Sequence, residues 1–178
     1  MNAIRVWHPA CASPMQSTPK LPVVNLADYP SYAAALAHNI GDEGLLLFEH
    51  DISADVNFAK RAWKLVGTAK HAWRTKFRRQ RVFSFTYPLY PKSTGLPEPV
   101  FAHRMNGEFA TKRVRYSVLA DACGFGCVYL PPSTAEIFSA GIGPEWDYPA
   151  LDTTFCRYWR QTGGTIVVLP EEVKHCHV

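Results

Sequence analysis

The chain has 178 residues, of which 47% are hydrophobic, 13% aromatic and 19% charged, and its formal net charge is +4. This length and composition are typical of one packed domain and exclude a disordered regulator. No run of about 18 apolar residues is present, which excludes a membrane-spanning helix. The first twenty residues lack the apolar run of a signal peptide and the cysteines number five, so we expect a reduced, cytoplasmic setting.

Residues 1–20 carry Pro, Ser and Thr with little periodicity. We expect them to form an N-terminal arm that can be flexible and that adds one edge strand around Ile4–Trp7. The remaining residues, 21–178, are expected to form a single globular domain.

The first elements of that domain alternate between strand and helix. A short strand is predicted from Pro22 to Leu26. A helix is predicted over 31–40, with Ser31 as its N-cap. The apolar run "GLLLFEH" (44–50) predicts the next strand.

The longest helix is predicted over 54–79, where apolar residues recur at helical spacing. These residues are Val56, Ala59, Trp63, Val66, Trp73 and Phe77. Gly67 lies near the middle of this segment and weakens the helix by about 1 kcal/mol relative to Ala, which leaves room for a kink or a break into two helices there.

From residue 82 onward the sequence changes to short β-rich segments separated by Pro, Gly or polar turns. They are "VFSFTY" (82–87), "PVFAH" (99–103), "KRVRYSVL" (112–119), "GCVYL" (126–130), "TTFCRYW" (153–159) and "GTIVVL" (164–169). This pattern predicts an antiparallel sheet system with the helices packed outside it, which is an α+β fold.

The end of the chain has a recognisable spacing. In "GGTIVVLPEEVKHCHV" (163–178), five residues separate Gly164 from Pro170, and four separate Pro170 from His175. This spacing resembles the last part of a double-stranded β-helix, the barrel of cupins and of Fe(II)/2-oxoglutarate oxygenases, although Glu172 stands where cupins usually have Gly. The segment "LPVVNLADYPSYAAALAHNIGDEGLLLFEHDIS" (21–53) also looks like the N-terminal part of many 2-oxoglutarate oxygenases. The resemblance implies a double-stranded β-helix-like core flanked by the N-terminal helices.

The same resemblance implies an Fe(II) site of two histidines and one carboxylate. His103 and His175 would be the histidines, and Glu108 the carboxylate, because Met105 stands where the family motif has Asp or Glu. The family's 2-oxoglutarate clamp normally follows the second histidine, but this sequence ends three residues after His175. Arg113 or Arg115 would then hold the 2-oxoglutarate carboxylate.

A zinc site is an alternative. Cys123 and Cys127 of "CGFGC", together with His175, Cys176 and His177, have the ligand types of a tetrahedral zinc site. The same stretch is also compatible with a Gly-rich turn that enters a strand, with Cys127 as a small core residue.

The chain has no acidic residue between Asp55 and Glu98, and the cations in this interval are Lys60, Arg61, Lys64, Lys70, Arg74, Lys76, Arg78, Arg79, Arg81 and Lys92. Such a field attracts phosphate or carboxylate groups. A nucleic acid or other polyanion is therefore a predicted partner, bound by Lys70, Arg74, Lys76, Arg78, Arg79 and Arg81. A solvated helix face is the alternative interpretation.

Three functions follow from these patterns. The first is a Fe(II)/2-oxoglutarate oxygenase-like protein that oxidises a nucleic-acid or other polyanionic substrate. The second is a non-catalytic nucleic-acid-binding or assembly protein that uses the basic helix 54–81, and the third is a structural zinc-binding protein. Whether the chain is an enzyme stays open, but it lacks the motifs of P-loop nucleotide binding, dinucleotide binding, zinc deaminases and Gly-x-Ser-x-Gly hydrolases.

Overall fold

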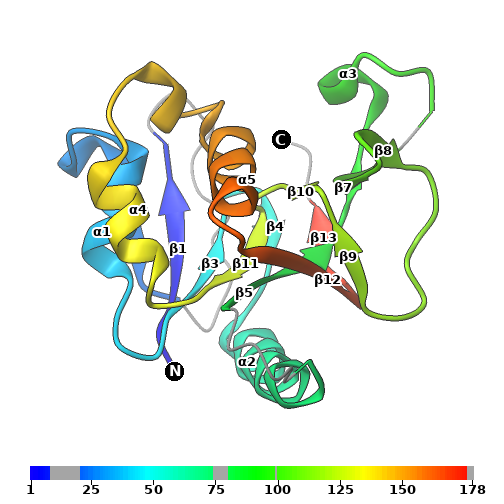
Figure 1. The fold of residues 1–178 in the computed structure, drawn as a ribbon, viewed down its shortest axis with the longest axis horizontal. Coiled ribbons are helices and arrows are strands. Elements are labelled where there is room, and N and C mark those ends of the chain that lie inside the picture. Colours follow the sequence, from blue (N-terminus) through cyan, green and yellow to red (C-terminus); the bar gives the residue numbers. More distant parts are fainter. Residues whose placement is uncertain (9–20, 74–79, 99, 176–178) are drawn as a thin grey trace.

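The main sheet of the protein has seven strands in the spatial order β2-β1-β3-β11-β5-β12-β9 (Figure 1). The computed structural model describes residues 1–8, 21–73, 80–98 and 100–175. The strands of this sheet are β1 (Ala3–Trp7), β2 (Val23–Asn25), β3 (Leu45–Phe48), β5 (Arg81–Thr86), β9 (Val118–Ala120), β11 (Cys127–Leu130) and β12 (Thr165–Glu172). The β2–β1, β1–β3 and β5–β12 pairs are parallel, and β11 runs antiparallel to both β3 and β5. Strands β1, β2, β3, β5 and β12 therefore all end at the same edge of the sheet.

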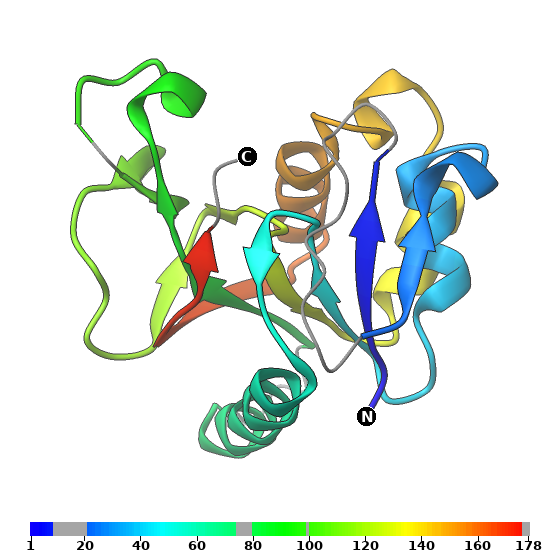
Figure 2. The same cartoon turned by 180° about the vertical axis from the view of Figure 1, so that it is seen from behind.

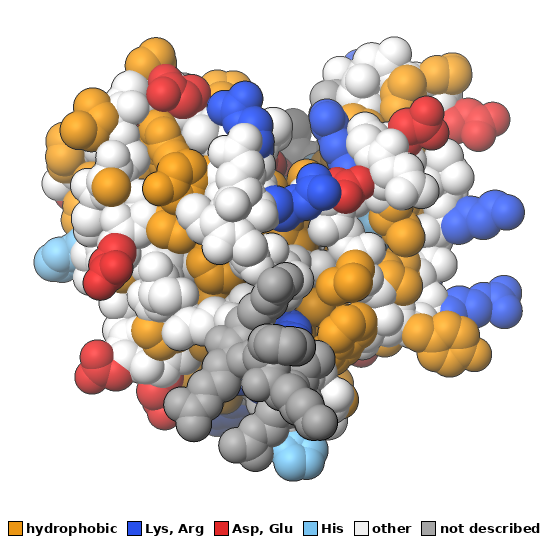
Figure 3. Space-filling model, in the orientation of Figure 1, with side chains coloured by type: hydrophobic (Ala, Val, Ile, Leu, Met, Phe, Trp, Pro, Cys, Tyr) orange, Lys and Arg blue, Asp and Glu red, His pale blue; other side chains and the backbone are white. Residues whose placement is uncertain are grey.

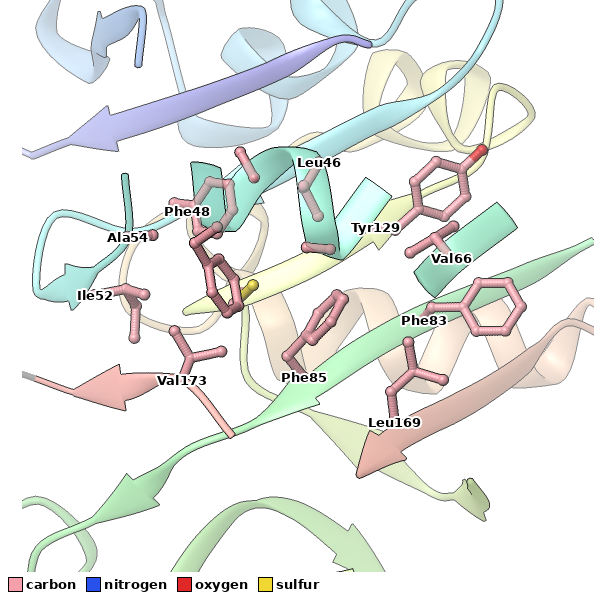
Figure 4. Close-up of a cluster of buried hydrophobic side chains, with 14 of the residues drawn as sticks. Leu46, Phe48, Ile52, Ala54, Val66, Phe83, Phe85, Tyr129, Leu169 and Val173 are labelled. Atoms are coloured by element: carbon pink, nitrogen blue, oxygen red, sulfur yellow. The ribbon is translucent and has the colours of Figure 1, made fainter. Parts of the chain in front are cut away.

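Helices cover both faces of this sheet, as Figures 1 and 2 show. They are α1 (Tyr32–Asn39), α2 (Val56–Ala72), α4 (Thr134–Ala140) and α5 (Leu151–Gln161). Successive side chains of a strand point to opposite faces, so each central strand contributes to two cores. Leu46 and Phe48 pack with α2 in one core (Figure 4), and Leu45 and Leu47 pack with α1, α4 and α5 in the other. None of the described helices combines the length and the hydrophobicity needed to cross a bilayer.

A small lobe lies at the other end of the molecule from α1 and α4 (Figures 1 and 2). Its elements are β6 (Pro88–Leu89), α3 (Pro91–Thr94), β7 (Val100–Met105), β8 (Glu108–Ala110) and β10 (Ala122–Cys123). A two-stranded sheet of β4 (Ile52–Ser53) and β13 (Lys174–His175) joins the segment after β3 to the segment after β12. Short 3-10 turns occur at Leu26–Asp28 and Pro144–Trp146.

The chain is a mixed α and β protein, as expected, but the double-stranded β-helix is not confirmed. The described main sheet is open, with β2 and β9 at its edges, and both of its faces are covered by helices. The parallel pairs follow from long connections, since β3 lies beside β1 and β12 lies beside β5. Antiparallel pairing joins β11 and β9 to their neighbours in the main sheet, the strands of the small lobe to one another, and β4 to β13.

Two helix predictions are confirmed at their starts. Ser31 caps α1 by accepting a hydrogen bond from the Ala34 amide, and Asp55 caps α2 through the Phe58 amide. Helix α2 continues through Gly67 to Ala72 without a break. The rest of the predicted helix, residues 74–79, lies outside the described residues.

Three strand predictions are wrong in detail. Residues 112–117 of the strand expected over 112–119 lie in no strand, and β9 begins only at Val118. The strand near Ile4–Trp7 is not at an edge, because β1 pairs with β2 on one side and β3 on the other. Residues 153–159 lie in helix α5 rather than in a strand. Leu151, Phe155 and Trp159 recur every four residues and are buried, so helical burial outweighs the β-propensity of the aromatic and Thr residues.

A pair of glycine substitutions tests the packing at the start of β3. Gly44 has a φ of +88°, and an added Cβ would meet the Tyr129 ring and the Leu130 carbonyl oxygen. We expect Gly44→Ala to lower the free energy of unfolding by about 3 kcal/mol. Gly67→Ala is the matched control, because nothing lies near its added Cβ, and it should raise the same free energy by about 1 kcal/mol. Urea denaturation measures both, and equal effects would contradict the packing described for Gly44.

Candidate functional site

A pocket of about 280 Å³ that contains several carboxyl groups lies at the edge of the sheet where the parallel strands end. Glu49 and Asp51 follow β3, Tyr87 follows β5, and His175 follows β12. Other elements close the pocket, with Tyr32 from α1, His103 from β7, Arg104 from β7 and Asp152 from α5. Open sheets with parallel strands commonly bind ligands at this edge, so the carboxylate pocket is the leading candidate for a functional site.

Arg5 fixes the segment that carries two of these carboxylates. This buried side chain, 3% exposed, comes from β1. Its Nη1 donates to the carbonyl oxygens of Glu49, His50 and Ile52 at 3.2, 3.3 and 2.7 Å, and its Nη2 donates to that of Ala54 at 2.8 Å. Because guanidinium stays charged and its donors are planar, the path of residues 49–54 is held from within.

Asp51 and His175 form a close pair at the pocket wall. Their Oδ2 and Nε2 atoms are 2.8 Å apart, and the pairing of β13 with β4 brings the two residues together. Burial raises the pKa of Asp51, but the hydrogen bond and the charge of His175 outweigh it and hold this pKa below its usual value. The other carboxylate oxygen, Oδ1, is buried and has no hydrogen-bond partner among the described residues.

Glu49 has the opposite protonation preference. Burial, followed by the charges of Asp51 and Asp152, raises its pKa to about 8. Tyr32 Oη lies 3.2 Å from Glu49 Oε1 and donates to it. At neutral pH Glu49 is therefore mostly protonated while Asp51, two residues later, is ionised. Glu49 is thus able to donate a proton at neutral pH, whereas Asp51 carries a negative charge.

Asp152 and His103 complete the titratable set. Burial raises the pKa of Asp152, which lies in the first turn of α5, and lowers the pKa of His103. His103 is 1% exposed, and neither of its ring nitrogens has a hydrogen-bond partner among the described residues. Buried polar atoms in native proteins are usually satisfied, so an unsatisfied histidine in a pocket wall is a functional signal.

The predicted Fe(II) ligands are only partly brought together. His103 and His175 both line the pocket, but Glu108 is exposed on β8 and does not. Glu108 pairs with Met105 across the β7–β8 hairpin, outside the pocket wall, and Asp51 lies beside His175 instead. Within the described ranges, no three His, Cys, Asp or Glu side chains are already arranged around a point where a metal ion could sit.

The predicted 2-oxoglutarate clamp lies elsewhere. Arg113 and Arg115 are both exposed and do not line the pocket. Arg113 contacts the Glu172 carboxylate at 3.5 Å. Arg104, which the sequence did not single out, is the arginine at the pocket wall.

The cysteines of "CGFGC" are parts of the two cores. Cys123 packs against Cys156 with their sulfur atoms 4.0 Å apart, and Cys127 lies in the other core. Gly124 and Gly126 leave room for the Tyr87 ring, whose Oη accepts a hydrogen bond from the Gly126 amide at 3.0 Å. Cys127 is thus a small core residue in β11. Cys176 and His177, the remaining zinc candidates, lie outside the described residues.

The predicted nucleic-acid-binding segment is described only in part. Lys70 lies against Tyr129, with Nζ 2.5 Å from the Tyr129 hydroxyl and 4.0 Å from the ring centroid, and burial lowers its pKa. Arg81 begins β5 at the edge opposite the carboxylate pocket. Arg74, Lys76, Arg78 and Arg79 lie outside the described residues.

Sequence reasoning did not identify Arg5, Glu49, Asp51 or Asp152. A signal for two of them was present, since Glu49 and Asp51 directly follow the buried run "GLLLF" (44–48) and are two residues apart. The signals for Arg5 and Asp152 depend on contacts between distant segments.

Comparison with known proteins adds a likeness in fold. The structure is similar to the crystal structure of A197 from STIV, with a TM-score of 0.57, 13% sequence identity, and coverage of 100% of this chain and 87% of that chain. No family model and no curated protein matches the sequence. At this identity the likeness concerns the fold alone.

Replacing Arg5 tests its control of the site. We expect Arg5→Met to lower the free energy of unfolding by about 3 kcal/mol, because buried carbonyl groups lose a charged donor. Amide hydrogen exchange over residues 49–54 should become faster. The control Arg115→Met changes an exposed arginine and should shift stability by less than about 0.5 kcal/mol. Equal stability losses would contradict the role of Arg5.

The raised pKa of Glu49 predicts a pH-dependent effect of Glu49→Gln. The folded protein holds this proton up to about pH 8, whereas the unfolded chain releases it near pH 4.5, so Glu49 reduces stability progressively as pH rises between these values. Removing the ionisable group should therefore stabilise the protein more at pH 9 than at pH 5. Urea denaturation at both values measures the difference, and a variant with the same stability change at both would contradict the pKa assignment.

Proposed function

We propose that this protein is a group-transfer enzyme that acts in the carboxylate pocket, most specifically a glycosyl-transfer enzyme that uses a phosphate-activated donor and a divalent cation. The observation that carries the proposal is the convergence of Glu49, Asp51, Asp152 and His175 at the carboxyl edge of the sheet. The chemistry of each follows from its surroundings.

Asp51 and His175 are the proposed cation ligands. Adjacent ligands of an octahedral cation with bonds of about 2.1 Å lie about 3 Å apart, and the Asp51–His175 contact is 2.8 Å. Carboxylate oxygen and imidazole nitrogen together suit Mn²⁺ and related ions, and such ions are often held by only one or two side chains plus substrate phosphates. The cation would supply charge neutralisation for the departing phosphate.

The surplus of carboxylates favours glycosyl over phosphoryl transfer. A glycosyl centre becomes positively charged in its oxocarbenium-like transition state, which nearby carboxylates stabilise. A transferring phosphoryl group needs a surrounding clamp of cations, whereas Arg104 is the one arginine or lysine among the described residues that line the pocket. Because Glu49 is protonated at neutral pH and Asp51 would bind the cation, the carboxylate left to face this transition state is Asp152.

Asp152 and Glu49 are suited to moving protons. Burial raises the pKa of Asp152, which makes it a better base for an acceptor hydroxyl. Glu49, with a pKa of about 8, is protonated at neutral pH and donates a hydrogen bond or a proton. Tyr32 and Tyr87 add aromatic surface for the carbon-bound hydrogens of a sugar ring.

Manganese binding tests the proposal directly. We expect Asp51→Asn to weaken Mn²⁺ binding by at least about tenfold in isothermal titration calorimetry, while the exposed control Asp42→Asn leaves it unchanged. Release of nucleoside diphosphate from nucleoside diphosphate sugars should depend on Mn²⁺ and fall by at least about 100-fold in Asp152→Asn. Absence of Mn²⁺ binding, or binding that Asp51→Asn does not weaken, would refute this function.

The Fe(II)/2-oxoglutarate oxygenase is the second candidate. It is favoured by the presence of His103 and His175 in one pocket, with the Asp51 carboxylate beside His175. A polyanionic or nucleic-acid substrate, and a nucleic-acid partner for the basic helix, stay predictions with it. Succinate release that needs Fe(II) and 2-oxoglutarate, without Mn²⁺-dependent release of nucleoside diphosphate, would establish this candidate over the first.

A further inference from the structure

A shallow groove of about 450 Å³ adjoins the carboxylate pocket between helix α5 and strands β7 and β10. Arg104, Ala122 and Thr153 line both hollows, so the groove and the pocket are continuous. Arg157 and Arg160 line the groove but not the carboxylate pocket. Figure 3 shows Lys and Arg side chains gathered on this face near α5.

The arginines of the groove outnumber its carboxylates. Asp121 is the acidic residue of its wall, and it contacts Arg160 at 3.1 Å through Oδ1 and accepts from the Gly107 amide through Oδ2. Arg157 is exposed and makes no ion pair with the described residues. Arg104 lies over the Phe109 ring, 4.4 Å from its centroid. Asp121 thus pairs with Arg160, whereas Arg157 and Arg104 make no ion pair with the described residues, although the charge of Arg104 acts on Asp152 and lowers its pKa.

These arginines stand on opposite walls of the groove. Thr153, Arg157 and Arg160 follow one another at spacings of four and three residues, which places them on one face of α5. Arg104 is held on the other wall, where β7 pairs with β10 through Arg104 and Ala122. Planar guanidinium groups bind phosphate and carboxylate through two parallel hydrogen bonds, and two walls of guanidinium can grip one such anion from both sides.

The groove joins the pocket on the side of Asp152. It opens into the pocket beside Asp152, because its shared residue Thr153 is the next residue along α5. Asp51 and His175, the proposed cation ligands, line the pocket but not the groove. A group bound in the groove therefore lies next to the part of the pocket that Asp152 lines.

We propose that this arginine groove binds an anionic group, a phosphate or a carboxylate, on the acceptor substrate whose hydroxyl reacts at Asp152. The assignment of the anion to the acceptor rests on the function proposed above. The acceptor is then a molecule with two chemical parts: a neutral hydroxylated part for the acidic pocket and an acidic part for the groove.

Anion binding by the whole protein tests the groove without any reaction. Inorganic phosphate and acetate are titrated separately at low salt with EDTA present, and binding is followed by calorimetry. We expect the double variant Arg104→Gln, Arg157→Gln to raise the phosphate Kd by at least about tenfold. Asp121→Asn frees Arg160 and should lower the Kd. Tighter binding of phosphate than of acetate identifies a phosphorylated acceptor, and the reverse order a carboxylated one.

Three controls separate the possible outcomes. Arg113→Gln removes an exposed arginine outside the groove and should leave binding unchanged. Arg157→Gln alone affects only an exposed side chain, so its weakened binding counts even if the double variant folds poorly. Asp51→Asn should still bind phosphate in EDTA. Binding lost in Asp51→Asn, kept in Arg157→Gln, or absent from the wild-type protein would overturn the groove proposal, whereas failure of the function shows separately in the Mn²⁺ titration.

Discussion

The site depends on one buried guanidinium group. Arg5 reaches from β1 to the carbonyl oxygens of residues 49, 50, 52 and 54, all in the segment that leaves β3. Without such a partner, four convergent carbonyl dipoles beside ionisable carboxylates would be costly to bury. Strand β1 is therefore both a structural member of the sheet and the internal support of the loop that carries Glu49 and Asp51.

Two regions of opposite charge meet at α5. Its first turn contributes Asp152 to the carboxylate pocket, and its later turns contribute Arg157 and Arg160 to the groove. The net charge of +4 does not reveal this separation, because it sums the charges of the whole chain and includes both the acidic pocket and the basic groove. Neighbouring regions of opposite charge favour substrates whose charge also differs from one end to the other. The electrostatic field orients such substrates before contact is complete.

The parts of the structure that depend on local sequence were predictable. Ser31 signals the start of α1 because an N-cap needs only the next three residues, and the run 45–48 signals β3 because a strand buried on both faces is apolar throughout. The position of β1 was not predictable, since it depends on pairing with strands more than ten residues away. Likewise His103 and His175 could be singled out by motif, but the partner of His175 is Asp51, 124 residues earlier, and no local pattern joins them.

Strand β11 also determines the order in which the molecule can be assembled. It lies between β3 and β5 and is hydrogen-bonded to both. It therefore connects the part of the sheet formed by β2, β1 and β3 to the part that contains β5. Its residues, Cys127–Leu130, are synthesised after those of both neighbours. During translation β3 and β5 are synthesised well before β11. The backbone groups of both strands that pair with β11 therefore stay unpaired until it emerges. A ribosome-bound fragment that ends before Cys127 therefore holds the β2-β1-β3 part of the main sheet, whereas its β5 lacks both sheet neighbours, β11 and β12.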